Sequence, residues 1–89
     1  MEAQEFAAGL AREGFVEIET KTIAARPANE DHGHDCIVRG MVLDGEFIVA
    51  CNGKPRAYHK GEIFEVPANT PHTEEIGPGG TTIVVGRKY

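Results

Sequence analysis

The sequence predicts an all-β domain, a small antiparallel barrel or sandwich, with one short helix at its N-terminus. From residue 15 onward, short runs rich in Val, Ile, Thr and Phe alternate with Gly, Pro and Asn turns. Many short strands between tight turns are typical of sandwiches and closed barrels. The length of 89 residues suits one domain. We therefore expect residues 1–14 to form a helix packed on a single β domain of residues 15–89.

The helix is expected over residues 3–12. Its apolar side chains recur at the three- and four-residue spacing of one helical face: Ala3, Phe6, Ala7, Leu10 and Ala11. Gly14 follows directly, at the position where helices commonly end. This spacing predicts a helix that covers part of the β domain.

The β domain is expected to consist of short strands joined by turns. Asp44-Gly45 and Asn52-Gly53 have the composition of two-residue hairpin turns. Pro and Gly residues predict further turns at residues 67–71 and 77–80. The strands between these turns are expected over residues 15–24, 32–43, 47–50, 56–59, 63–66, 72–76 and 81–86.

Charge and composition exclude several classes of function. The net charge of −5 argues against nucleic acid as the main partner, since phosphate binding needs a basic surface. No apolar run is long enough to span a membrane, and the acidic N-terminus does not resemble a signal peptide. The two cysteines, Cys36 and Cys51, do not form a disulfide framework and suit a reducing compartment. We expect a cytoplasmic protein with no membrane or nucleic-acid partner.

The chemistry is concentrated in the histidines. His32 and His34 are two residues apart, so on one strand they would project from the same face. Two imidazoles on one face can hold a metal ion, although a pair in a polar loop is also commonly just exposed. His72, after the turn at residues 67–71, offers a third ligand. His59 beside Lys60-Gly61 is expected on the surface.

Two further side chains accompany this predicted site. Glu74 follows His72 at the same strand parity and is a candidate catalytic proton carrier or fourth ligand; a solvent-facing carboxylate is the alternative. Cys36 has the parity of His34 and could also bind the ion, but small buried cysteines are more common. The inward positions nearby, Val38, Gly40 and Ile76, predict a tight, apolar pocket for a small molecule.

One motif in the sequence resembles the second conserved motif of the cupin superfamily. Gly61, Pro67 and His72 have the spacing of that motif. Asn69 replaces its internal glycine, which is tolerable because Asn visits the left-handed region. Ile76 replaces its final asparagine. The resemblance implies a small β-barrel of the jelly-roll type, as in single-domain cupins.

The first cupin motif is matched only in part. His32 and His34 reproduce its His-x-His, and Gly45 stands where its last glycine falls. Val38, however, occupies the place of the family's metal-binding glutamate. The resemblance therefore carries over three metal ligands, His32, His34 and His72, for a divalent ion such as Fe, Mn, Ni or Zn.

Three functions remain open at this point. The resemblance implies a metalloenzyme of the dioxygenase or isomerase type that acts on a small molecule. The missing glutamate instead favours a non-catalytic module that binds or senses a small ligand. A structural protein with vestigial histidines is the third possibility. We also expect a homodimer, because Ile37, Met41 and Leu43 face away from the histidines and need a cover, from the helix, other strands or a second chain.

Overall fold

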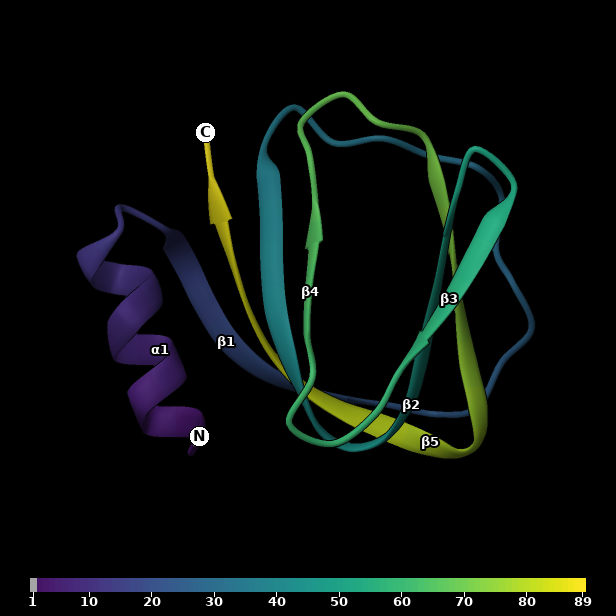
Figure 1. The fold of residues 1–89 in the computed structure, drawn as a ribbon, viewed down its shortest axis with the longest axis horizontal. Coiled ribbons are helices and arrows are strands. Elements are labelled where there is room, and N and C mark those ends of the chain that lie inside the picture. Colours follow the sequence, from purple (N-terminus) through teal and green to yellow (C-terminus); the bar gives the residue numbers. More distant parts are fainter. Residues whose placement is uncertain (1) are drawn as a thin grey trace.

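A computed structural model describes residues 2–89 as one strongly curled antiparallel β-sheet with a helix on its outer side (Figure 1). The strands follow the order β1-β5-β2-β3, and β4 pairs with β2. All four strand pairings of this sheet are antiparallel, which confirms the predicted all-β class with one N-terminal helix. The elements are α1 (Ala3–Arg12), β1 (Val16–Ile23), β2 (Ile37–Cys51), β3 (Lys54–Tyr58), β4 (Ile63–Val66) and β5 (His72–Lys88).

The two longest strands, β2 and β5, pair with each other and bend together. The register shifts between Val42 and Asp44 and again between Gly45 and Phe47. Gly45 has a φ of 80°, and a Cβ there would collide with the carbonyl oxygen of Gly80. The hairpin turn predicted at Asp44-Gly45 is therefore wrong: these residues form an irregularity within one continuous strand, where Gly permits the bend.

A second predicted turn is also wrong for the same reason. Residues 77–80, expected as a turn between two strands, lie inside β5. Gly80 has a φ of 75° and faces the bend of β2. Glycines on both strands thus let the sheet curl without a break, and turn composition alone could not distinguish a bend from a reversal.

The other turns agree with the sequence. Asn52 and Gly53 have φ values of 54° and 75° and connect β2 to β3 as a tight hairpin. Residues 67–71 connect β4 to β5, with Asn69 at a φ of 58°. That value is in the left-handed region, which Asn tolerates better than most residues.

The apolar side chains form two clusters on opposite faces of the sheet. The inner cluster fills the curl: Val42, Phe47, Val49, Phe64, Val66, Ile76, Ile83 and Val85. The outer cluster lies under the helix: Phe6, Leu10, Phe15, Met41 and Val84. Burial of these side chains supplies the main favourable free energy of folding.

Strand alternation holds in the first part of β2, before its irregularity. Val38 packs against the inner cluster, whereas Ile37, Met41 and Leu43 belong to the outer cluster beneath α1. The helix thus provides cover for the apolar face that motivated the expected homodimer, and the homodimer stays a prediction. Across residues 2–89 no helix combines the length and apolar character that crossing a bilayer needs.

Candidate metal centre

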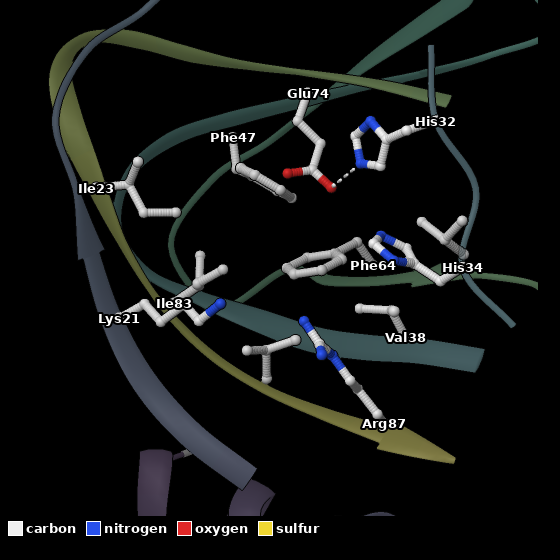
Figure 2. Close-up of a pocket in the computed structure, with 12 residues that line it drawn as sticks. Lys21, Ile23, His32, His34, Val38, Phe47, Phe64, Glu74, Ile83 and Arg87 are labelled. Carbon is white, nitrogen blue, oxygen red and sulfur yellow. Dashed lines mark ion pairs between the residues drawn. The ribbon is translucent and has the colours of Figure 1, made fainter. Parts of the chain in front are cut away.

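Four side chains converge at one end of the curled sheet. They are His32, His34, His72 and Glu74, and one potential ligand atom from each lies within 4.8 Å of all the others. The imidazole centroids of His32 and His72 are 4.4 Å apart, and His34 lies 5.1 Å and 5.3 Å from them. Figure 2 shows Glu74 directed toward His32, with His34 below them. The structure therefore brings together every histidine that the sequence assigned to the site.

The sequence predicted that His32 and His34 lie on one strand, and this prediction is wrong. β2 begins only at Ile37, so the two histidines do not share a strand. His32 instead forms an isolated bridge with His72, in which each backbone N–H donates to the other residue's carbonyl at 3.0 and 2.8 Å. The carbonyl of His34 accepts a bond from the Asn69 N–H at 2.7 Å. Backbone pairing with the β4–β5 turn and with β5, rather than strand parity, thus gathers the imidazoles.

His72 is fixed by burial and by a hydrogen bond at Nδ1. Its side chain is 1% exposed, and Nδ1 lies 3.1 Å from the carbonyl oxygen of Thr70. A carbonyl only accepts, so Nδ1 carries the hydrogen and the neutral ring keeps its lone pair on Nε2. His32 is held in the same way, with Nδ1 3.0 Å from the carbonyl oxygen of Glu30. This arrangement orients imidazoles for a metal through Nε2.

Both of these lone pairs face the same carboxylate oxygen. Oε2 of Glu74 lies 3.0 Å from Nε2 of His72 and 3.6 Å from Nε2 of His32. Three acceptor atoms so close together repel one another unless a proton or a cation lies among them. The donor set of three imidazoles and one carboxylate therefore fits a divalent metal ion.

Glu74 points into the group and not into solvent. Its side chain is 24% exposed, and its backbone N–H donates to Oδ1 of Asn29 at 2.8 Å. Arg26 donates to the Glu74 carbonyl at 3.1 Å, and its guanidinium lies 3.7 Å from Glu74 Oε1. Sequence reasoning missed Arg26, because only the bridge between Arg26 and Ile76 brings this loop residue to β5.

The carboxylate comes from a different strand than the family motif expects. Val38, at the motif position of the glutamate, lines the cavity beside the histidines, while Glu74 enters the group from β5. Cys36 is 2% exposed but does not belong to the group, so its interpretation as a buried apolar residue is favoured. His59 has a side chain 57% exposed and lies apart from the group, as expected.

A cavity of about 120 Å³ lies beside this group. Val38 lines it as expected; Gly40 and Ile76 are buried on the same inner side, against Phe64 and within the inner cluster, but do not border the cavity. Most of the wall is apolar: Ile23, Val38, Phe47, Phe64, Val66, Ile83 and Val85. Two cations that the sequence reading missed, Lys21 and Arg87, complete the lining. Strand alternation could have revealed both, since Lys21 shares the face of Ile23, and Arg87 that of Val85.

Electrostatics favour the neutral form of His34. Burial lowers the pKa of His34 from its usual value of 6.5, and the neighbouring His32 and His72 lower it further. Glu74 opposes this shift, and the positive charge of Arg87 adds to it. Because a metal binds the unprotonated ring, the lowered pKa of His34 keeps this ligand available near neutral pH.

The sequence matches a family model described as "Cupin domain" over residues 15–84. This chain belongs to the cupin domain family. The match runs from the residue before β1 to Val84 in β5 and includes all four residues of the group. A search of curated proteins finds no significant match.

Solved structures share the fold. A cupin 2 conserved barrel domain protein from Salinispora arenicola superposes with a TM-score of 0.69 at 15% identity, over 81% of this chain and 61% of that protein. An RmlC-like cupin from Shewanella frigidimarina gives 0.62 at 24% identity, over 82% and 68%. A protein from Neisseria meningitidis gives 0.67 at 14% identity, over 99% and 98%. At these identities the likeness concerns the fold alone.

Proposed function

We propose that this cupin domain binds a divalent metal ion through His32, His34, His72 and Glu74, and admits a small molecule beside it. The convergence of their four ligand atoms within 4.8 Å is the observation that carries the proposal. Imidazole and carboxylate ligands suit Zn, Fe, Mn and Ni. The metal donors proposed from the sequence were the three histidines, and Glu74 joins them as the fourth.

The adjoining cavity supports access of a small ligand to the ion. Its volume of about 120 Å³ borders both His32 and His34. A bound divalent ion acts as a Lewis acid toward an oxygen of such a ligand. Glu74 also borders the cavity, so it can accept a proton there when it is not held by the ion. A Lewis acid and a proton acceptor beside one cavity favour an enzyme that acts on a small molecule. Turnover of a substrate would distinguish such an enzyme from a sensing module, which only binds its ligand.

The test of metal binding uses variants on matched residues. The chelator-treated chain is titrated with Zn²⁺, Mn²⁺, Ni²⁺ and anaerobic Fe²⁺ by calorimetry and by melting temperature. We expect one equivalent of at least one ion to bind and to raise the melting temperature, because the ion binds only the folded site. His34→Ala and Glu74→Gln should weaken this binding at least about tenfold, as loss of an outer partner of a metal site already can.

The controls are His59→Ala and Glu46→Gln, which remove the same groups from the exposed His59 contact. Both should bind metal like the unmodified chain. If no ion shifts the melting temperature, or if the variants in the group bind as tightly as the controls, the proposal fails.

A further inference from the structure

The cavity beside the metal-type group has two chemically different ends. His32, His34 and Glu74 line it together with Lys21 and Arg87, and in Figure 2 the two cations lie across the space from Glu74 and His32. Figure 2 shows the Lys21 amine and the Arg87 guanidinium both directed into the space between them. A cavity that places fixed positive charge opposite a metal-type group is suited to a ligand with a negatively charged end.

Lys21 is half-buried against apolar side chains without a partner for its charge. It lies on β1 opposite Ile83 in the sheet register, and Ile23 follows on the same face. Among residues 2–89, no carboxylate forms an ion pair with its ammonium group. Burying an ammonium beside apolar surface costs free energy unless a partner compensates it. An anion in the cavity supplies that compensation.

Arg87 has hydrogen-bonding capacity to spare. It continues the inward-facing row of β5 after Ile83 and Val85, and its Nη1 lies 3.8 Å from Oε1 of Glu17. Both side chains of this pair are more than a third exposed, at 37% and 49%, so water screens the contact. A guanidinium has five N–H donors in a planar fork, which matches the two oxygens of a carboxylate.

The side chains between the two ends determine the size and the polarity of the rest of the ligand. Phe47 and Phe64 lie with ring centroids 4.8 Å apart, and both line the cavity. A cavity of about 150 Å³ can hold benzene, so one of about 120 Å³ accepts roughly four to seven non-hydrogen atoms. A phosphate of that size would place oxygen atoms against apolar walls, whereas a short aliphatic acid would place methyl groups there.

We propose that the cavity binds a small aliphatic carboxylate, whose carboxylate lies on Lys21 and Arg87 and whose apolar body contacts Phe47 and Phe64. The inference names the substrate class of the proposed metal centre and rests on that function only for the metal end of the ligand. Lys21 and Arg87 form the cationic end without any metal ion. We therefore expect the carboxylate to bind there whether or not a metal is present.

Isobutyrate and isobutyramide are the probes that test the charge. They have the same shape and size, and only the first is an anion. We expect ligand-observed NMR at pH 8, where histidines are largely neutral, to show isobutyrate binding at about millimolar concentration to the full chain, as received and after chelation. Isobutyramide should bind at least about tenfold more weakly, as the loss of a charged hydrogen-bonding partner predicts. Equal binding of the amide, or of inorganic phosphate, would overturn the carboxylate assignment.

Three methionine variants test the residues. Lys21→Met and Arg87→Met should each weaken isobutyrate binding about tenfold, since each removes one charged donor. Lys60→Met removes the same charge from an exposed turn and should bind isobutyrate like the unmodified chain. Unchanged affinity in both cavity variants, or no isobutyrate binding at all, contradicts the proposal.

The metal titration keeps the two proposals distinguishable. Lys21→Met should retain the metal affinity of the unmodified chain, because Lys21 is not among the four potential ligands. If metal binds and isobutyrate does not, only the carboxylate inference fails. If isobutyrate binds through Lys21 and Arg87 while no metal binds, only the metal function fails.

Discussion

Two histidines of this domain contact a glutamate at the same distance, yet their surroundings differ. His72 Nε2 lies 3.0 Å from Glu74 Oε2, and His59 Nε2 lies 3.0 Å from Glu46 Oε2. The His72 side chain is 1% exposed, whereas that of His59 is 57% exposed. The contact distance therefore does not identify a site, and the difference must lie in what surrounds each pair.

The two histidines differ in the partner of their other ring nitrogen, Nδ1. Nδ1 of His59 faces a second carboxylate, Glu62, at 3.5 Å, so a protonated His59 would satisfy both contacts. Nδ1 of His72 faces the Thr70 carbonyl instead, which leaves only Nε2 for the glutamate and the converging imidazoles. The exposed pair is complete as an ordinary surface contact, whereas the buried group needs a cation or a proton at its centre.

The largest effect that separates the two pairs is on folding stability. Replacing His72 with Ala removes a buried ring and should lower the free energy of unfolding of the metal-free chain by about 2–4 kcal/mol, as for other large-to-small core substitutions. His59→Ala should change it by no more than about 0.5 kcal/mol, because surface substitutions rarely do more. Urea denaturation in the presence of chelator measures both. Similar losses for the two variants would contradict the contrast drawn between them.

The strand alternation and the His72 motif could be read from the sequence, but the curvature of the sheet could not. Each strand of the domain was anticipated at least in part, and β4 was predicted at its observed bounds. The bends at Gly45 and Gly80 have the composition of turns, and only the pairing of β2 with β5 decides that the chain continues. Such long-range pairing leaves no local signal in the sequence.

The candidate site was predictable where it depends on histidine spacing. His32, His34 and His72 were found by spacing and resemblance, although the bridge between His32 and His72 replaces the assumed strand. Arg26 was missed because it contacts Glu74 only through a loop. Lys21 and Arg87 were missed because charged residues on strands are usually exposed, and the parity that turns these two inward was not applied to them.

A pH titration provides a smaller effect that tests the buried group. Burial and the neighbouring imidazoles lower the pKa of His34 in the folded chain, so between this lowered value and about 6.5 the unfolded chain binds more protons. The stability of the metal-free chain should therefore be greatest above about pH 6.5 and fall as the pH is lowered through that window.

Urea denaturation between pH 8 and pH 5 measures this dependence, with His34→Gln as the comparison. The variant lacks the titrating group and should lose less stability on acidification than the unmodified chain. A metal-free chain that becomes more stable as the pH falls below 6.5, or a variant with an unchanged pH profile, would show that His34 is not held neutral by its surroundings.

The smallest predicted effect concerns how Glu74 is oriented. Arg26 contacts the Glu74 carbonyl at 3.1 Å and its carboxylate at 3.7 Å, whereas the exposed Glu46 has His59 as its partner. Arg26→Met should weaken metal binding by about two- to fivefold, the range expected for a partly exposed ion pair. Arg39→Met is the control, because Arg39 pairs with Glu13 and Glu65 instead.

A double-mutant cycle shows whether Arg26 acts through Glu74. If it only orients this carboxylate, Arg26→Met should have no further effect on metal affinity in the Glu74→Gln chain, because the group it orients no longer binds as a carboxylate. Calorimetric metal affinities of the four chains give the coupling. If the two losses simply add, Arg26 acts independently of Glu74, and the buried group owes its geometry to backbone pairing alone.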